Sequence, residues 1–477
     1  MFESLFTHDY WWARFLFQKG LAAVYLFAFV VVLKQFVPLL GSGGLLPVSQ
    51  FLRHATFDQA PSIFHFFYSD RFLIFVAWSG IALSSAALLG VTNKLPWWGS
   101  AALWGLLWVL YLSIVNVGQT FYAFGWESLL LEAGFVAIFL GNNKFAVPIL
   151  LIFLLRWLLF RLEFGAGLIK IRGDECWRDL TCLVYHHETQ PMPGPLSWYF
   201  HNLPPWMHTL ETAGNHFFQL VVPWGLFFPQ PVAAIAAGLI MFSQFWLVLS
   251  GNFSWLNWMA IILAFSGFSN AQLGKVLALS PPAALLRPLI FQGLVSAAAI
   301  LVIFLSWWPI KNMLSRHQLM NASFNPYHIV NTYGAFGSVT KKRYEIVLEG
   351  TNEATITPET LWQEYEFRGK PGDPKRRPPQ AAPYHLRLDW LMWFASFGPE
   401  EQRHWFLPFV EKLLRNDTAA LKLLRHNPFP AVPPLFIRAR YYLYTFTTPR
   451  ERKETGAWWG RELVGEYLEP ARLELPH

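Results

Sequence analysis

The sequence predicts a multispanning α-helical membrane protein of about nine transmembrane helices, followed by a C-terminal α+β domain outside the membrane. Of the 477 residues, 54% are hydrophobic, 18% are aromatic and only 14% are charged, and the mean hydropathy is +0.30. Apolar runs of about 20 residues, the length that crosses a bilayer core, recur as far as Trp308. Beyond Pro309 the pattern changes to short alternating and helical segments typical of a domain in water.

Nine apolar runs approach the length of a membrane span. Two of them, 71–92 and 97–118, are nearly free of charge, whereas 120–140 and 145–170 carry charged side chains that must face the protein interior. The segment 47–69 is too rich in charge to span, and we expect it to form a loop with an amphipathic helix on the membrane surface. The expected spans are residues 18–40, 71–92, 97–118, 120–140, 145–170, 206–228, 231–250, 253–269 and 284–309.

The distribution of charge predicts how the chain is oriented. Lysine and arginine between the spans place the N-terminus in the cytoplasm, and the loop 171–205 and residues 311–477 on the other side. The predicted domains are therefore a membrane domain, 1–310, which includes that extracytoplasmic loop, and an extramembrane domain, 311–477. No cleavable signal peptide is expected. The net charge of +7 indicates contact with membrane lipids, and without any DNA- or RNA-binding motif we expect no nucleic-acid binding.

The predicted extramembrane domain mixes strands with helices. Alternating or β-branched runs predict strands, and helical spacing of apolar residues predicts two helices between them. A proline-rich basic segment, 369–383, is expected to be a loop in solvent or against lipid headgroups. The expected strands are residues 342–350, 362–368 and 436–447, and the expected helices are 387–397 and 405–424.

Charged residues recur every seven positions along the fifth expected span, at Arg156, Glu163 and Lys170. Seven residues make nearly two helical turns, so these side chains form one stripe. Lys170 would reach the outer interface, where desolvation favours a neutral amine that can act as a base or a nucleophile. In the alternative interpretation, Lys170 extends to the interface or pairs with a carboxylate. Glu127 and Glu132 point in different directions on the preceding helix, so each is expected to pair with a basic residue.

A polar stripe also follows the sixth expected span. His208, Glu211, Asn215 and Gln219 recur at three- and four-residue intervals, with His216 close by. Polar groups facing lipid would lack hydrogen bonds, so this stripe must face the bundle interior or a cavity. Two interpretations remain open: a proton relay or binding wall beside Lys170, or a hydrogen-bonded seam between helices.

The loop 171–205 contains histidines and both cysteines of the chain. Its histidines do not have the spacing of metal ligands on a helix, and no HExxH or Cys-His motif is present, so a hydrogen-bonded loop is favoured and no metal site is expected. Cys176 and Cys182 are candidates for a local disulfide, and two separate buried thiols are the alternative. The polar residues concerned are His186, His187, Glu188 and His201.

Several stretches resemble the lipase maturation factor family. The longest, Arg161 to Trp224, contains RLEFGAGLIKIRGDECW and resembles the family's signature region. This resemblance implies a multispanning protein of the endoplasmic reticulum membrane in animals, or of the inner membrane in a bacterium, with a secreted lipase-type client protein as its partner. The supporting stretches are Phe121–Phe135, Gly251–Trp258, Phe324–Gly350, Arg387–Phe394 and Arg438–Thr447.

The membrane half is also similar, more distantly, to the membrane domain of vitamin K-dependent gamma-carboxylases. In that family a lysine after an Ala-Gly pair acts as the base toward a hydroquinone, and Ala166, Gly167 and Lys170 match this pattern. Glu127 stands about where the carboxylases have a histidine. The resemblance implies a cavity for a quinone-like lipophilic molecule as cofactor or substrate.

Two functional hypotheses follow, and the sequence leaves open whether the chain is an enzyme. The first is a membrane-embedded folding and maturation factor, or chaperone, for secreted proteins. The second is a membrane enzyme that uses Lys170, with Glu127 and Glu163 as further catalytic candidates. The residues expected to line its cavity are Arg156, Arg161, Glu132, His208, Glu211, Asn215, His216 and Gln219.

Overall fold

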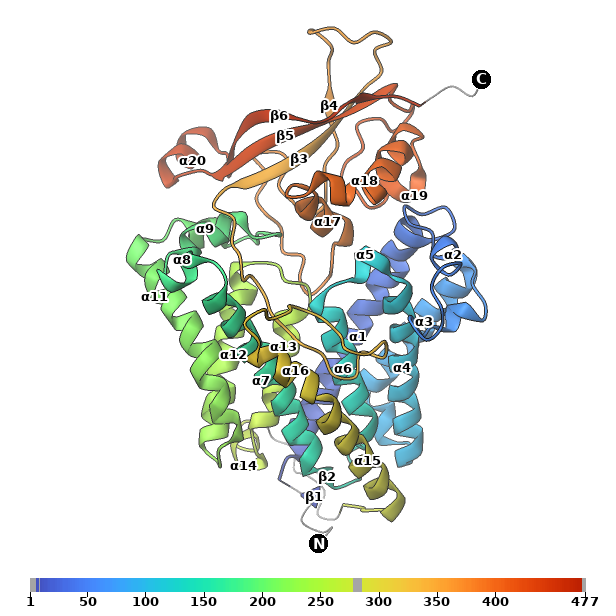
Figure 1. Ribbon diagram of the computed structural model, residues 1–477, viewed down its shortest axis with the longest axis vertical. Coiled ribbons are helices and arrows are strands. Elements are labelled where there is room, and N and C mark those ends of the chain that lie inside the picture. The colour runs from blue at the N-terminus through green and yellow to red at the C-terminus, as the bar shows by residue number, and fades with distance from the viewer. Residues whose placement is uncertain (1–5, 8, 278–284, 474–477) are drawn as a thin grey trace.

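The computed structural model describes residues 6–7, 9–277 and 285–473 and consists of a helical bundle with a small β-sheet domain at one end (Figure 1). The first long helix begins at the end of the bundle opposite the sheet. One continuous set of buried apolar side chains extends from bundle residues such as Tyr25 and Leu130 to Leu391 and Phe409 of the C-terminal domain. The two halves therefore share a hydrophobic core.

Five helices in the described part of the chain are long and apolar enough to cross a membrane. The expected count of nine spans is thus not confirmed. Residue 284, the expected start of the ninth span, lies outside the described residues. The five are α1 (Trp11–Leu40), α3 (Asp70–Leu88), α4 (Trp97–Val117), α12 (Val232–Ser250) and the segment Leu289–Leu314, which contains α15 (Leu289–Leu305) and α16 (Trp307–Leu314).

The other four expected spans depart from simple membrane helices in length, charge or regularity. α6 has only 15 residues, and almost all of its side chains are buried. α7 has 24 residues but carries the predicted stripe of charge. The sixth span loses α-helical hydrogen bonding before Pro223, which has no N–H to donate. These segments are α5 (Gln119–Tyr122), α6 (Gly125–Phe139), α7 (Ile149–Arg172), α11 (Pro205–His216) with a π-helical turn (Phe217–Val221) and a 3-10 turn (Val222–Phe227), and α13 (Leu256–Ala264) with a 3-10 turn (Phe265–Gly267).

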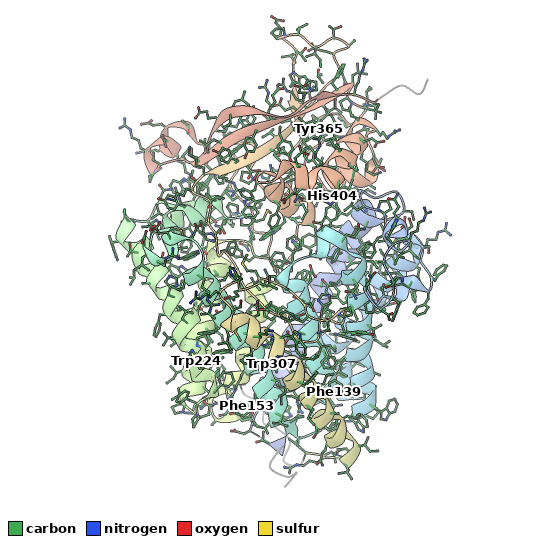
Figure 2. All side chains as sticks on the ribbon, viewed as in Figure 1. Phe139, Phe153, Trp224, Trp307, Tyr365 and His404 are labelled. Carbon is green, nitrogen blue, oxygen red and sulfur yellow. A yellow bond between two sulfur atoms is a disulfide. The ribbon has the colours of Figure 1, made fainter. Side chains whose placement is uncertain are left out.

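The sides of the bundle present large aromatic side chains. Phe153, Trp224 and Trp307 project from it (Figure 2), and they are 40%, 52% and 62% exposed. The segment 47–69 contains only the four-residue helix α2 (Val48–Phe51) and a 3-10 turn (Ile63–His65), so the expected amphipathic helix is reduced to about one turn. Exposed aromatic rings on the bundle suit contact with lipid.

Four antiparallel strands form the sheet, in the order β4-β3-β5-β6. Two expected strands are present as β3 (Arg343–Thr351) and β5 (Phe436–Phe446), which pair along the whole of β3. The third, 362–368, is reduced to β4 (Gln363–Glu364). The edge strand β6 (Trp459–Ala471) is not predicted by the sequence, because only one of its residues is buried and it lacks apolar alternation.

Three helices, α17 (Arg387–Ala395), α18 (Pro399–Leu414) and α19 (Thr418–Leu421), lie between the sheet and the bundle (Figure 1). The expected helix 405–424 is therefore two helices. Asn416, with φ +52°, interrupts the helical conformation between them. The carboxylate of Asp417 then caps α19 by accepting from the backbone N–H groups of Ala419 and Ala420.

A segment without helices or sheet strands, 315–342, returns along the bundle from α16 to β3 (Figure 1). Gly165 of α7 makes room for it, because a Cβ there would lie 2.5 Å from the carbonyl oxygen of Tyr333. We call this segment the strap. The remaining short elements are β1 (Phe6–Thr7), β2 (Val147–Pro148), α8 (Glu175–Arg178), α9 (Cys182–Thr189), α10 (Ser197–His201), α14 (Asn270–Leu273) and α20 (Pro449–Thr455).

Candidate functional site

Lys170 lies in a buried polar cluster between α7 and the π-helical turn. Its amine donates a hydrogen bond to Oε1 of Gln219 at 2.8 Å and lies 5.3 Å from the ring centre of Trp177. Asn215 donates to the same glutamine oxygen at 3.3 Å. Gly167 permits this packing, because a Cβ there would lie 2.7 Å from the leucine side chain that follows Gln219. The lysine is 4% exposed, so its amine is shielded from bulk solvent.

Glu163 lies two turns before Lys170 on α7 and has its own amide partners. Gln244 of α12 donates to Oε1 of Glu163 at 2.6 Å, and Asn257 of α13 donates to Oε1 of Gln244 at 2.7 Å. Oε2 of Glu163 is buried and has no hydrogen-bond partner among the described residues. Within the same residues, the Lys170 amine and the Glu163 carboxylate are not in ion-pair contact. Lys170 and Glu163 are close enough for their charges to interact, although their short hydrogen bonds go to different amides, Gln219 and Gln244.

Arg161 and Glu132 form a second buried cluster. Their side chains pair directly, and the carboxylate also accepts from the hydroxyl of Tyr333 at 2.8 Å and from the backbone N–H of Asn331 at 3.0 Å. Arg161 in turn donates to the carbonyl of Asn331. The strap therefore supplies the groups that complete a charge pair inside the bundle.

Glu127 pairs with the C-terminal domain. Arg387, the first residue of α17, contacts Oε1 of Glu127 at 2.8 Å and donates to the carbonyl of Phe121 at 2.7 Å. The guanidinium carbon lies 3.4 Å from the ring centre of Tyr122, and the hydroxyl of Tyr111 donates to the same carboxylate. The structure does not bring Glu127 into contact with Lys170 among the described residues. Its position ties the C-terminal domain to the bundle.

Arg156 bonds to backbone instead of joining the other charged side chains of its stripe. It donates to the carbonyls of Ser266 at 2.9 Å and Leu226 at 3.0 Å, each at or near the end of a 3-10 turn. Carbonyls at helix ends lack partners within the helix, so a buried guanidinium satisfies them. Arg156 thus stabilises the irregular ends of the sixth and eighth expected spans.

The predicted polar stripe of the sixth span divides into two groups. Asn215 and Gln219 join Lys170, whereas His208 and Glu211 approach His187 of α9. Nε2 of His187 lies 3.0 Å and Nδ1 of His208 lies 3.7 Å from Oε2 of Glu211. His216 instead bonds to the carbonyl of Trp177 through Nε2, at 2.9 Å.

The loop 171–205, which we call the outer loop, docks on the sheet through Glu188 and Arg343. The carboxylate of Glu188 accepts from the backbone N–H of Phe446 in β5, and Arg343 of β3 donates to the carbonyl of Glu188 at 2.9 Å. Arg343 also pairs with Glu345 at 2.6 Å. Burial raises the pKa of Glu188 to about 6 and lowers the pKa of nearby His201 to about 4. These contacts fix the loop against the C-terminal domain.

Cys176 and Cys182 form a disulfide, with their Cα atoms 4.7 Å apart. The bond connects α8 to the first residue of α9, and both cysteines are buried. It lies at the end of the bundle that carries the sheet (Figure 1). The local link restrains the loop that presents His187 and Glu188.

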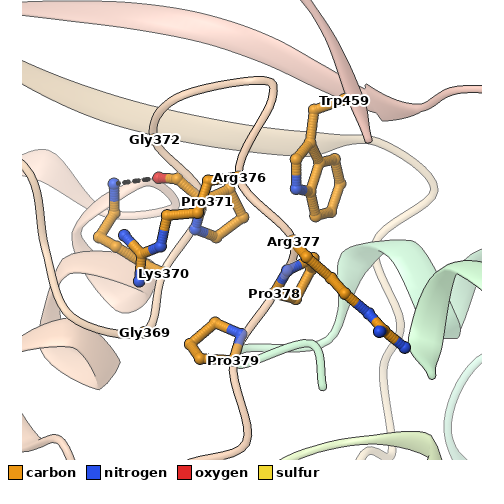
Figure 3. Close-up of a pocket in the computed structure, with 9 residues that line it drawn as sticks. All are labelled: Gly369, Lys370, Pro371, Gly372, Arg376, Arg377, Pro378, Pro379 and Trp459. Atoms are coloured by element: carbon orange, nitrogen blue, oxygen red, sulfur yellow. Dashed lines mark hydrogen bonds between the residues drawn. The ribbon is translucent and has the colours of Figure 1, made fainter. Parts of the chain in front are cut away.

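The proline-rich segment 369–383 lines a small pocket against Trp459 (Figure 3). Lys370 in this segment is 2% exposed, and its amine donates to the carbonyl of Pro371 at 3.2 Å and pairs with Glu345 at 2.8 Å. The basic segment is therefore anchored in the domain at one end instead of being entirely solvated.

Sequence reasoning misses several partners in these clusters. Gln244 and Asn257 contact the Glu163 group, and Trp246 donates to Oε1 of Glu211 at 2.6 Å. The available signal was an amide within an otherwise apolar span, because such a group must find a partner inside the protein. Arg387 had no such signal, since an arginine at the start of a helix in water needs no buried partner.

Comparison with known proteins identifies the family. The family model described as lipase maturation factor transmembrane domain matches residues 12–275, and that of the lipase maturation factor C-terminal domain matches residues 329–469. Human lipase maturation factor 1 is 42% identical, covering 98% of this chain and 89% of that protein. The bovine protein of the same name is 42% identical, covering 97% and 89%. Human lipase maturation factor 2 is 28% identical, covering 97% and 83%. No solved structure matches the chain. With five apolar helices and both family domains, this integral membrane protein belongs to the lipase maturation factor family.

Proposed function

We propose that this chain is a membrane-embedded maturation factor that assists the folding of secreted proteins, lipases among them. Family membership through both domains supports this role, since the relatives are named for lipase maturation. The observation that carries the proposal is the buried contact between the two halves: Arg387 enters the bundle at Glu127, and Arg343 holds the outer loop. A joined loop and sheet give a folding client one continuous surface at the membrane.

The proposed surface faces the compartment in which secreted proteins fold. The Cys176–Cys182 disulfide lies at the same end of the bundle as the sheet, and disulfides form in oxidising compartments. This favours an N-terminus in the cytoplasm and a C-terminal domain in the lumen of the endoplasmic reticulum, or in the periplasm of a bacterium. Membrane lipids would surround the apolar helices.

A secretion assay tests the proposal. A secreted homodimeric lipase is produced in cells that lack their own maturation factor, with this chain or with an empty vector. We expect the chain to raise lipase activity in the medium per unit of lipase protein. Unchanged specific activity, with the chain present in the membrane at normal amount and the lipase competent to fold with a known factor, would contradict the proposal.

A second candidate function, a membrane enzyme that uses Lys170, is favoured by one observation. The buried Lys170 amine donates a hydrogen bond to Gln219, and within the described residues no carboxylate is in direct ion-pair contact with it, although Glu163 is near enough to interact electrostatically. Such an amine is suited to proton transfer. Mass spectrometry of lipophilic molecules that co-purify with the wild type and with Lys170→Met tests it. A quinone-like compound present only with the wild type supports the enzyme, and identical lipid profiles argue against it.

A further inference from the structure

A triad of potential metal ligands, His187, His208 and Glu211, lies where the outer loop meets α11. One nitrogen of each histidine and one oxygen of the glutamate all lie within 4.8 Å of one another. His187 comes from α9, whereas His208 and Glu211 come from one face of α11, three residues apart. Three donors from two elements therefore converge on one point.

The spacing of the donors is close to that of a zinc site. Nε2 of His187 lies 3.0 Å and Nδ1 of His208 lies 3.7 Å from Oε2 of Glu211. Zinc binds histidine nitrogen and carboxylate oxygen at about 2.0–2.2 Å, which places neighbouring donors of a tetrahedron roughly 3.3 Å apart. A small closing movement of His208 would complete three ligands.

Outer contacts orient two of the three ligands. The indole N–H of Trp246 donates to Oε1 of Glu211 at 2.6 Å, which leaves Oε2 toward the histidines. Nε2 of His208 lies 3.3 Å from the carbonyl oxygen of His201, so this nitrogen carries the proton and Nδ1 presents its lone pair. Histidines that bind a metal typically donate their other ring N–H to a backbone carbonyl or a carboxylate, and carboxylates that bind a metal are in turn hydrogen-bonded.

The described residues do not supply a hydrogen-bond partner for every buried nitrogen of this cluster. His208 is 2% exposed, and its Nδ1 has no hydrogen-bond partner among the described residues. A proton on Nε2 of His187 would give the Glu211 carboxylate a hydrogen bond but would leave Nδ1 of His208 without a hydrogen-bond partner. Buried polar atoms normally have partners, so an unpartnered nitrogen aimed at a carboxylate indicates a missing group.

We propose that His187, His208 and Glu211 bind one zinc ion. Two imidazoles and one carboxylate suit zinc, whereas calcium and magnesium prefer oxygen ligands. Three protein ligands leave the fourth position of the tetrahedron for water or an incoming group. The ion would fix the outer loop to α11 directly beside Glu188, which holds β5. This inference does not depend on the proposed function.

Metal analysis of the full-length protein tests the inference. The protein carries an affinity tag without histidine, is purified in detergent without chelators from cells grown with zinc, and is analysed by inductively coupled plasma mass spectrometry. We expect about one zinc per chain in the wild type and less than about a fifth of that in His187→Gln and His208→Gln. His216→Gln, on the same helix but bonded to Trp177, is the matched control and should retain the metal.

Two results would overturn the inference. One is zinc far below one ion per chain in the wild type, and the other is full zinc content in the His187→Gln/His208→Gln double variant. Because a variant can lose metal by misfolding, the stripped wild-type protein is also titrated with Co²⁺. Tetrahedral Co²⁺ absorption that saturates at one equivalent and is displaced by Zn²⁺ supports the site, and the absence of that absorption contradicts it.

Discussion

Replacing Arg387 by methionine should undock the C-terminal domain from the bundle. The guanidinium and the Glu127 carboxylate are 0% and 1% exposed at the side chain and 2.8 Å apart. Removing one partner of a buried pair leaves an uncompensated charge and costs about 3–5 kcal/mol. Since about 1.4 kcal/mol is a factor of ten, the undocked population should rise by roughly two to nearly four orders of magnitude.

Native-state proteolysis in detergent measures this change. The segment 369–383, whose Ala381 and Ala382 donate to the bundle residue Asn252, should be cleaved at a rate proportional to the open population when opening and closing are fast. Arg403→Met is the matched control, because Arg403 pairs with Glu400 at 55% and 80% exposure and an exposed pair contributes about 0–1 kcal/mol. The double variant Glu127→Gln/Arg387→Met should recover part of the loss, because it removes both charges. If Arg387→Met is cleaved no faster than Arg403→Met, the buried pair does not hold the domains together.

Two further substitutions test the packing of the bundle. Tyr333→Phe removes a hydroxyl that donates to Glu132 at 2.8 Å, and thermal unfolding in detergent should show a loss of about 1–3 kcal/mol; an unchanged midpoint would mean that the strap does not stabilise this charge. Gly134→Ala places a Cβ 1.9 Å from the hydroxyl of Tyr25 and should destabilise by about 1–3 kcal/mol, whereas Gly105→Ala, with nothing within 4 Å, should not. Equal stability of the two alanine variants would contradict the packing argument.

The membrane class and the interior position of the charged stripes could be predicted from the sequence. Composition predicts the membrane class. The interior position of the stripes follows because a charge such as Glu163 inside an apolar helix must find a protein partner. The contact between Lys170 and Gln219 also lies within reach of this reasoning, since both residues fall on polar stripes of neighbouring spans. Spacing along a helix gives the face that a residue occupies, and the bundle interior limits its partners.

Contacts between residues far apart in the chain could not be predicted in this way. The pairing of Glu127 with Arg387 and the approach of His187 to His208 depend on how the domain and the outer loop dock. The count of nine spans is not confirmed, and α6 is one of the segments concerned: it has 15 residues, most of them buried among its neighbours, and such a helix cannot be told from a membrane span by its apolar sequence alone. Strand β6 lies at the edge of the sheet, pairs with β5 and buries only one of its residues, so its sequence carries little of the apolar alternation that predicts a strand.

Secretion of an active lipase by Lys170 variants tests the central claim most directly. Lys170→Arg and Lys170→Met are compared with the wild type in cells that lack their own maturation factor, at equal amounts of folded protein in the membrane. A maturation factor that acts through its outer surface should keep most of its effect on lipase specific activity in both variants. Loss of that effect in both variants, with the fold intact, would contradict this account and would favour an enzyme that depends on the Lys170 amine.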